Sequence, residues 1–172
     1  METTITKCNG LKYEEEKWNG EILVCNYTNC YAYAINVPKN PLTDKIFINW
    51  SHIQPGNLGG INENYKCWNI EQNEEFVTKF INAVKEDLER ISYQIIPSTF
   101  EEISNDGWKV ALCFNTWDYH WYRLNDDGTW SHKSGKSRVT KRDEDWNIII
   151  NPKVCNRGSY NNFIGFYMIK KL

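Results

Sequence analysis

The sequence lacks a long apolar run and an excess of either charge, and each absence excludes a class of protein. No stretch of about 18 apolar residues occurs and the N-terminus has no apolar signal core, so we expect no membrane span and a cytoplasmic location. Non-classical export or delivery into a host stays open. Twenty Lys and Arg face 22 Asp and Glu, a net charge of −2, so no basic field draws the chain onto nucleic acid.

The cysteines also lack a defining pattern. Six are present, without a CxxC pair, which argues against a zinc ribbon or a thioredoxin-type motif. Because no export signal is seen, free thiols are expected rather than three disulfides. Cysteines and histidines have no metal-ligand spacing, so neither a metal nor another cofactor is predicted.

Aromatic residues, in contrast, are abundant. Eight Trp and ten Tyr occur among 172 residues, and such residues favour strands and semi-polar pockets over an aliphatic helical bundle. A chain of this length fits one domain. We therefore expect a single domain over residues 1–172, in which residues 1–20 form a polar N-terminal segment.

The first half of the chain predicts two helices. Thr28 and Asn29 are good N-caps and Pro38 ends the following segment, so a short helix is expected over about residues 30–37. Between residues 73 and 91 apolar residues recur at spacings of three and four, which predicts an amphipathic helix with Asn73 as its N-cap.

The last third of the chain changes to the patterns of strands. The segments are WKVALCFN (108–115), DYHWYRL (118–124), TWSHK (129–133) and FIGFYMIK (163–170). NDDG (125–128) predicts a tight turn between the second and third, so helices precede an antiparallel sheet in an α+β fold. The basic run KSGKSRVTKR (133–142) is expected to be a solvated loop, with anion binding as the alternative.

Cys30 follows the predicted caps directly, so its sulfur is placed at a helix N-terminus. There the dipole and the free N–H groups favour a thiolate, and a neighbouring cation helps to lower a cysteine pKa from about 8.5 to ~3.5–7.5. The same N–H groups can hold an oxyanion. Cys113, inside a strand pattern, and Cys25 are expected to be packed.

His120 and His132 are placed where a general base and the group that orients it would be expected. If their strands pair through NDDG, the partner of His120 falls at about position 133, so His132 is adjacent and a bulge or small shift would put both on one face. Trp121 then points to the opposite face, into the core. His52, in a loop, is the competing base.

These motifs resemble a known family. NCYAYAIN with Cys30, DYHWYRL with His120 and GTWSHKSG with His132 resemble the nucleophile, base and third polar element of the NlpC/P60-type papain-like superfamily, including a group of uncharacterised bacterial and viral members. The resemblance covers about residues 25–168. It implies a papain-like fold with N-terminal helices packed on a C-terminal antiparallel sheet. It also implies that Cys30 is the nucleophile, His120 the base and then the acid, and His132 the orienting group.

Four other residues are expected at the site. Gln54 is similar to the oxyanion donor of papain, although here it follows the cysteine in the chain instead of preceding it. Asn29 and Tyr31 flank the nucleophile. Asp118 shares the predicted face of His120 and is the rival orienting group.

The implied reaction is acyl transfer through a thioester on the cysteine. It is most simply the hydrolysis of a peptide, isopeptide or other amide, so the expected partner is a peptide, protein or amide substrate. An acyltransferase and a non-catalytic ligand- or protein-binding module on the same fold are the alternatives. The oligomeric state stays open.

Overall fold

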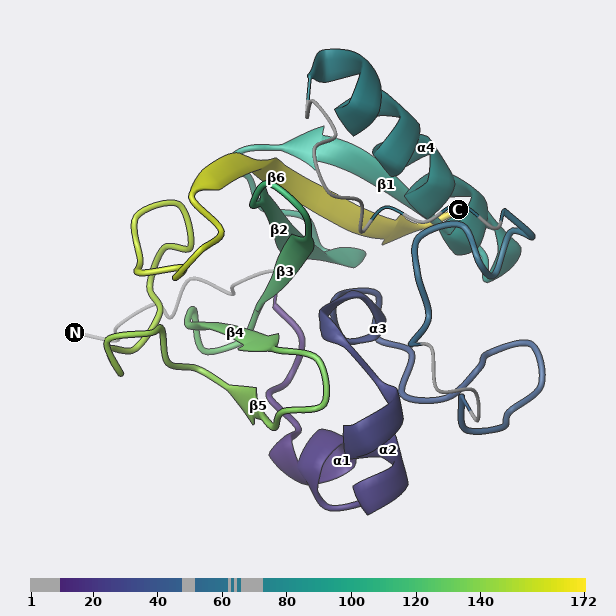
Figure 1. The fold of residues 1–172 in the computed structure, drawn as a ribbon, viewed down its shortest axis with the longest axis horizontal. Coiled ribbons are helices and arrows are strands. Elements are labelled where there is room, and N and C mark those ends of the chain that lie inside the picture. The colour runs from purple at the N-terminus through teal and green to yellow at the C-terminus, as the bar shows by residue number, and fades with distance from the viewer. Residues whose placement is uncertain (1–9, 48–51, 62, 64, 66–72) are drawn as a thin grey trace.

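The computed structural model describes residues 10–47, 52–61, 63, 65 and 73–172 (Figure 1). In this part of the chain, helices precede an antiparallel sheet, so the α+β class is confirmed. The helices are α1 (Glu15–Asn19), α2 (Ile22–Tyr27), α3 (Cys30–Ala34) and α4 (Glu74–Arg90). The strands are β1 (Tyr93–Ser98), β2 (Gly107–Phe114), β3 (Tyr119–Leu124), β4 (Trp130–Lys133), β5 (Val139–Thr140) and β6 (Asn162–Lys171).

The six strands lie in the order β1-β6-β2-β3-β4-β5. The C-terminal strand β6 therefore inserts between β1 and β2, whereas β2, β3 and β4 follow one another as antiparallel neighbours. Tyr122 pairs with His132, and Leu124 pairs with Trp130. The predicted hairpin through NDDG is present, and it brings the two histidine-bearing strands together.

The amphipathic helix α4 builds the main core. Its N-cap is Asn73, as predicted, whose side chain accepts a hydrogen bond from the Phe76 N–H at 2.9 Å. Phe80 is fully buried, with ring centroids 5.2 Å from Phe114 and 5.1 Å from Tyr119. In Figure 1, α4 lies beside β1. Burial of its apolar stripe therefore fixes the helix on the sheet.

Strand β3 is buried along its whole length. Tyr119 and Trp121 belong to the main core with α3 and α4, whereas Tyr122 and Leu124 belong to a second apolar cluster. Because side chains alternate along a strand, Trp121 and His120 lie on opposite faces of the sheet, as predicted.

Helix α3 ends earlier than predicted, at Ala34 instead of Val37. Asn36 has a left-handed backbone with φ of 60°, and the Val37 N–H donates to the Ala32 carbonyl at 2.9 Å. Asparagine tolerates this conformation, which commonly ends a helix. The stop signal was therefore Asn36 rather than Pro38.

Several short elements had no clear pattern in the sequence. Residues 10–20 are more than a polar segment, because they contain α1 with the fully buried Trp18. The Leu11 N–H also donates to the Leu124 carbonyl at 3.1 Å, which ties this segment to β3. Strand β1 contains Pro97 and lies at the edge of the sheet, where proline is tolerated.

Candidate active site

Cys30 is the first residue of α3, as the capping pattern predicts. The Asn29 side chain accepts a hydrogen bond from the Ala32 N–H at 3.0 Å and donates to the Ile53 carbonyl at 2.9 Å. The Cys30 Sγ lies 4.0 Å from the carbonyl oxygen of Tyr119, next to His120 in the chain. Because α3 has only five residues, its dipole supports a thiolate less than a long helix would.

The two predicted histidines are in direct contact. The Nε2 of His120 lies 2.7 Å from the Nδ1 of His132, and the rings are nearly perpendicular at 89°. The predicted register was wrong by one residue, since His132 pairs with Tyr122. His120 is two residues from Tyr122 and therefore shares the face of His132, without any bulge between the strands.

Hydrogen-bond chemistry assigns the protons of this pair. The Nε2 of His132 lies 2.9 Å from the Arg142 carbonyl oxygen, which only accepts, so this nitrogen carries a hydrogen. Burial lowers the pKa of His132 and favours its neutral ring, whose Nδ1 is then an acceptor. The Nε2 of His120 therefore donates to His132. In a neutral His120, Nδ1 is the nitrogen that accepts a proton.

Asp118 supports the His120 ring through Tyr160. Its carboxylate accepts hydrogen bonds from the Tyr119 N–H at 2.8 Å and from the Tyr160 hydroxyl at 3.0 Å. The Tyr160 ring stacks on His120 with centroids 5.0 Å apart. Burial raises the pKa of Tyr160, and negative charge on Asp118 and Cys30 adds to the shift. Asp118 and Cys30 thus lie close enough to Tyr160 for their charges to act on it. The residue that is hydrogen-bonded to Nε2 of His120 is His132.

The other residues expected at the site have structural partners. The Gln54 Oε1 accepts from the Tyr119 hydroxyl at 2.6 Å, and its Nε2 donates to the His52 carbonyl at 3.3 Å. Both ends of the Gln54 amide are thus hydrogen-bonded, one to β3 and one within its own loop, and its expected role as an oxyanion donor stays a prediction. Tyr31, which follows Cys30 in the chain, is fully buried in the core, and its expected role at the site stays a prediction.

Asp87 anchors this region and was missed in the sequence. Its carboxylate is fully buried and accepts hydrogen bonds from the Tyr31 hydroxyl at 2.6 Å, the Gly56 N–H at 2.7 Å and the Gly59 N–H at 2.8 Å. Burial raises its pKa, against the effect of these bonds. The sequence did contain a sign of this buried carboxylate. Asp87 lies three residues after Val84, and this spacing places it in the apolar stripe of α4.

Lys133 was expected both to end the strand TWSHK and to begin a solvated loop; the strand is confirmed, and the expected exposure of this residue is wrong. The residue ends β4 and is fully buried. Its Nζ donates to the carbonyl oxygens of Cys25 at 2.6 Å, Thr28 at 2.7 Å and Gly135 at 2.7 Å. Burial lowers the pKa of Lys133 to about 8, and negative charge on Cys25 and Cys30 opposes that shift.

The remaining thiols and the third histidine occupy different surroundings. Cys25, Cys30, Cys113 and Cys155 are free thiols, whereas Cys8 and Cys67 lie outside the described residues. Cys25 and Cys113 are buried, as predicted, and desolvation raises the pKa of Cys113. His52 lies in its loop with Nε2 3.2 Å from the Asn26 carbonyl oxygen.

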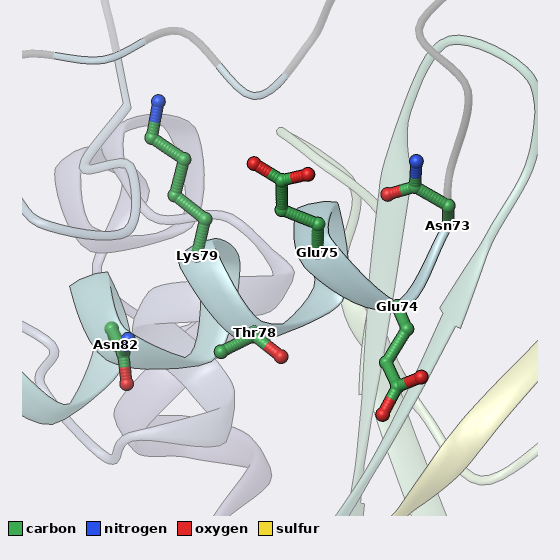
Figure 2. A pocket seen from close by; sticks show the side chains of 6 residues that line it. All are labelled: Asn73, Glu74, Glu75, Thr78, Lys79 and Asn82. Atoms are coloured by element: carbon green, nitrogen blue, oxygen red, sulfur yellow. The ribbon is translucent and has the colours of Figure 1, made fainter.

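Neither of two hollows on the described surface is lined by Cys30. One, of about 730 Å³, lies on the first turns of α4 (Figure 2), where Glu75 and Lys79 project to one side of the helix. The other, of about 510 Å³, reaches His132 from the side of β5 and Arg142. Cys30 and His120 are only 6% and 3% exposed, so a substrate needs part of their cover to open.

Within residues 10–47, 52–61, 63, 65 and 73–172, no three His, Cys, Asp or Glu side chains gather in a group able to hold a metal ion. No helix in the same ranges combines the length and the apolar character that crossing a bilayer requires.

Comparison with known proteins finds one relevant similarity. No family model and no solved structure matches the chain. The sequence is similar to insoluble matrix shell protein 1 of Ruditapes philippinarum, with 27% identity over 158 residues. The match covers 90% of this chain and 87% of that protein.

Acid is expected to destabilise the wild-type protein more than a His132→Asn variant. Because the folded pKa of His132 is lowered, the unfolded chain binds more protons between that pKa and about 6.5, and stability falls as the pH falls through this window. The loss is at most about 1.4 kcal/mol per pH unit, and the amide does not titrate. Urea unfolding at pH 7 and pH 5 measures it. A stability difference between the two proteins that is equal at both pH values would contradict the expectation.

Proposed function

We propose that the protein is a thiol hydrolase of papain-like organisation that cleaves a peptide, isopeptide or other amide bond at a Cys30–His120–His132 site. The observation that carries the proposal is the 2.7 Å bond between Nε2 of His120 and Nδ1 of His132, backed by the Arg142 carbonyl. A chain of buried polar groups holds its members rigidly, and this one fixes one tautomer of His120. A general base for a thiol requires such a fixed tautomer.

In the proposed reaction, the Cys30 thiol gives its proton to Nδ1 of His120, while Nε2–H stays donated to His132. The thiolate attacks the substrate carbonyl carbon, and the C=O electron pair moves to the oxygen. Collapse of the tetrahedral adduct breaks the C–N bond, and the amine leaves with the proton from Nδ1. This sequence leaves a thioester on Cys30.

The second half of the reaction uses the same nitrogen. Nδ1 of His120 takes a proton from water, whose oxygen attacks the thioester carbon. The second adduct expels the Cys30 sulfur, which regains the proton from Nδ1. A carboxylic acid is released and the starting protonation states return.

A Cys30→Ala variant is expected to lose acyl transfer completely. With p-nitrophenyl acetate as acyl donor, the wild-type protein should release nitrophenolate and carry an acetyl group on Cys30, measured by mass spectrometry after an acid quench. The matched control is Cys25→Ala, which removes another buried thiol nearby. Equal nitrophenolate release by wild type and Cys30→Ala, with circular dichroism showing both folded, would refute the proposal.

The shell relative supports a second candidate. That relative is named as an insoluble matrix protein of the shell, and such a role favours a non-catalytic binding module outside the cell rather than the predicted cytoplasmic enzyme. Absence of an acetyl-enzyme together with retained fold would favour this module. Transfer of the acetyl group to an added primary amine, instead of to water, would identify an acyltransferase.

A further inference from the structure

We propose that Lys133 is a positioning residue for Cys30: a buried ammonium group that fixes the chain entering α3 and favours the ionised form of the Cys30 thiol. This inference rests on the proposed function in taking Cys30 as the nucleophile. It adds a fourth side chain to the site, one that the resemblance to papain-like proteins does not supply.

The first argument is the position of the three acceptors. Thr28 immediately precedes the cap residue of α3, and Cys25 lies in α2, so Lys133 binds the main chain of the α2–α3 junction at two points. The Thr28 hydroxyl adds a hydrogen bond to the Val24 carbonyl at 2.6 Å. The start of α3, and with it the Cys30 sulfur, is therefore held by a side chain from β4.

The second argument is the alternation of side chains along β4. His132 binds His120 on one face of the sheet, and Lys133, the next residue, reaches the α2–α3 junction on the other. Two consecutive residues of one four-residue strand thus position the base and the nucleophile. A shift of β4 would displace both groups together.

The third argument is charge. The hydrogen-bond acceptors of the fully buried Lys133 ammonium are neutral carbonyl groups, so these bonds leave its positive charge uncancelled. Burying such a charge is costly. Negative charge on Cys25 or Cys30, when the thiol is ionised, raises the pKa of Lys133 against the larger effect of burial, so the ammonium group and a thiolate stabilise each other. In a region that excludes water, this attraction is stronger than in bulk solvent and favours a thiolate.

The test compares Lys133→Met with Lys109→Met. Lys109 is an equally buried lysine on β2 whose Nζ donates to the carbonyls of Phe100 at 2.7 Å and Glu102 at 2.5 Å. Each variant therefore loses one buried ammonium group that is hydrogen-bonded to backbone carbonyls. The Cys30 alkylation rate with iodoacetamide is measured from pH 5 to 10, with mass spectrometry of the modified peptide. A one-unit rise in apparent pKa reduces the thiolate about ten-fold at pH values below both pKa values.

The expected result is a reduction of at least about ten-fold in Lys133→Met and no change of the profile in Lys109→Met. A purely structural role would lower stability in both variants and leave the alkylation profile of Cys30 unchanged. A folded Lys133→Met variant with the wild-type profile overturns the inference.

A second measurement applies if Lys133→Met does not fold. The titration of the Lys133 side chain is followed by NMR in the wild type and in Cys30→Ser. Because coupling between two titrating groups is reciprocal, removal of the thiolate should lower the pKa of Lys133. Identical titration in the two proteins overturns the inference.

The outcomes separate this inference from the proposed function. A wild-type Cys30 that alkylates with an ordinary pKa near 8.5 and forms no acetyl-enzyme counts against the thiol hydrolase itself. A low wild-type pKa that persists in Lys133→Met overturns only the role of Lys133.

Discussion

A His120→Ala variant should turn over p-nitrophenyl acetate about 10²–10⁴-fold more slowly than the wild-type protein, because a positioned general acid–base group contributes this much to rate. The ring of His120 is held between the Tyr160 ring and His132. This packing keeps Nε2 bonded to His132 and leaves Nδ1 for the proton transfers of the proposed reaction. Alanine removes the base from both halves of the proposed reaction, whereas the nucleophile stays in place.

The matched control for this variant is His52→Ala. His52 lies in a loop and bonds to the Asn26 carbonyl, so its loss should leave turnover within about two-fold of wild type. Steady-state release of nitrophenolate at pH 7 measures both variants, with far-ultraviolet circular dichroism as the check on folding. A His120→Ala variant that keeps more than a third of the wild-type rate would remove His120 from the mechanism.

An Asp87→Ala variant is expected to lose about 3–5 kcal/mol of unfolding free energy. The carboxylate is the shared acceptor of one hydroxyl and two backbone N–H groups, and alanine leaves these donors buried without it. Each orphaned donor costs about 1–3 kcal/mol. Because the stability of a domain is only about 5–15 kcal/mol, this single change removes a large share of it.

Tyr31→Phe is the graded control for Asp87. It removes one of the three hydrogen bonds and keeps the packing of the ring, so a loss of about 0.5–1.5 kcal/mol is expected. Urea unfolding followed by tryptophan fluorescence measures both variants. If Asp87→Ala costs less than Tyr31→Phe, the carboxylate is not the anchor of the loop at residues 54–60.

Prediction from the sequence succeeded where a pattern extends over several turns or strand residues. The stripe of α4 and the cap Asn73 were readable because each residue contacts its neighbours three and four positions away. The strands β2, β3, β4 and β6 were readable because they are aromatic and apolar. The short elements α1, α2 and β5 carry too few positions for a period to be detected, and no side-chain cap marks the start of α1 or α2.

The candidate site was predictable only to the level of its local motifs. Asn29 caps the helix that begins at Cys30, and NDDG joins the strands of His120 and His132. The choice between His132 and Asp118 as partner of His120 depended on a register of one residue, which reverses the face of every side chain. That register depends on the geometry of the turn and on packing against the neighbouring strands.

The sequence by itself therefore determined that helices precede an antiparallel sheet, the cap before Cys30 and the hairpin that carries both histidines. Only the tertiary structure decided which polar groups meet. Lys133 bonds to carbonyls 108 and 105 residues away, and Asp87 bonds to a loop 31 and 28 residues before it. Contacts of this kind leave no local period in the sequence, because they form when the apolar faces of distant elements are buried together.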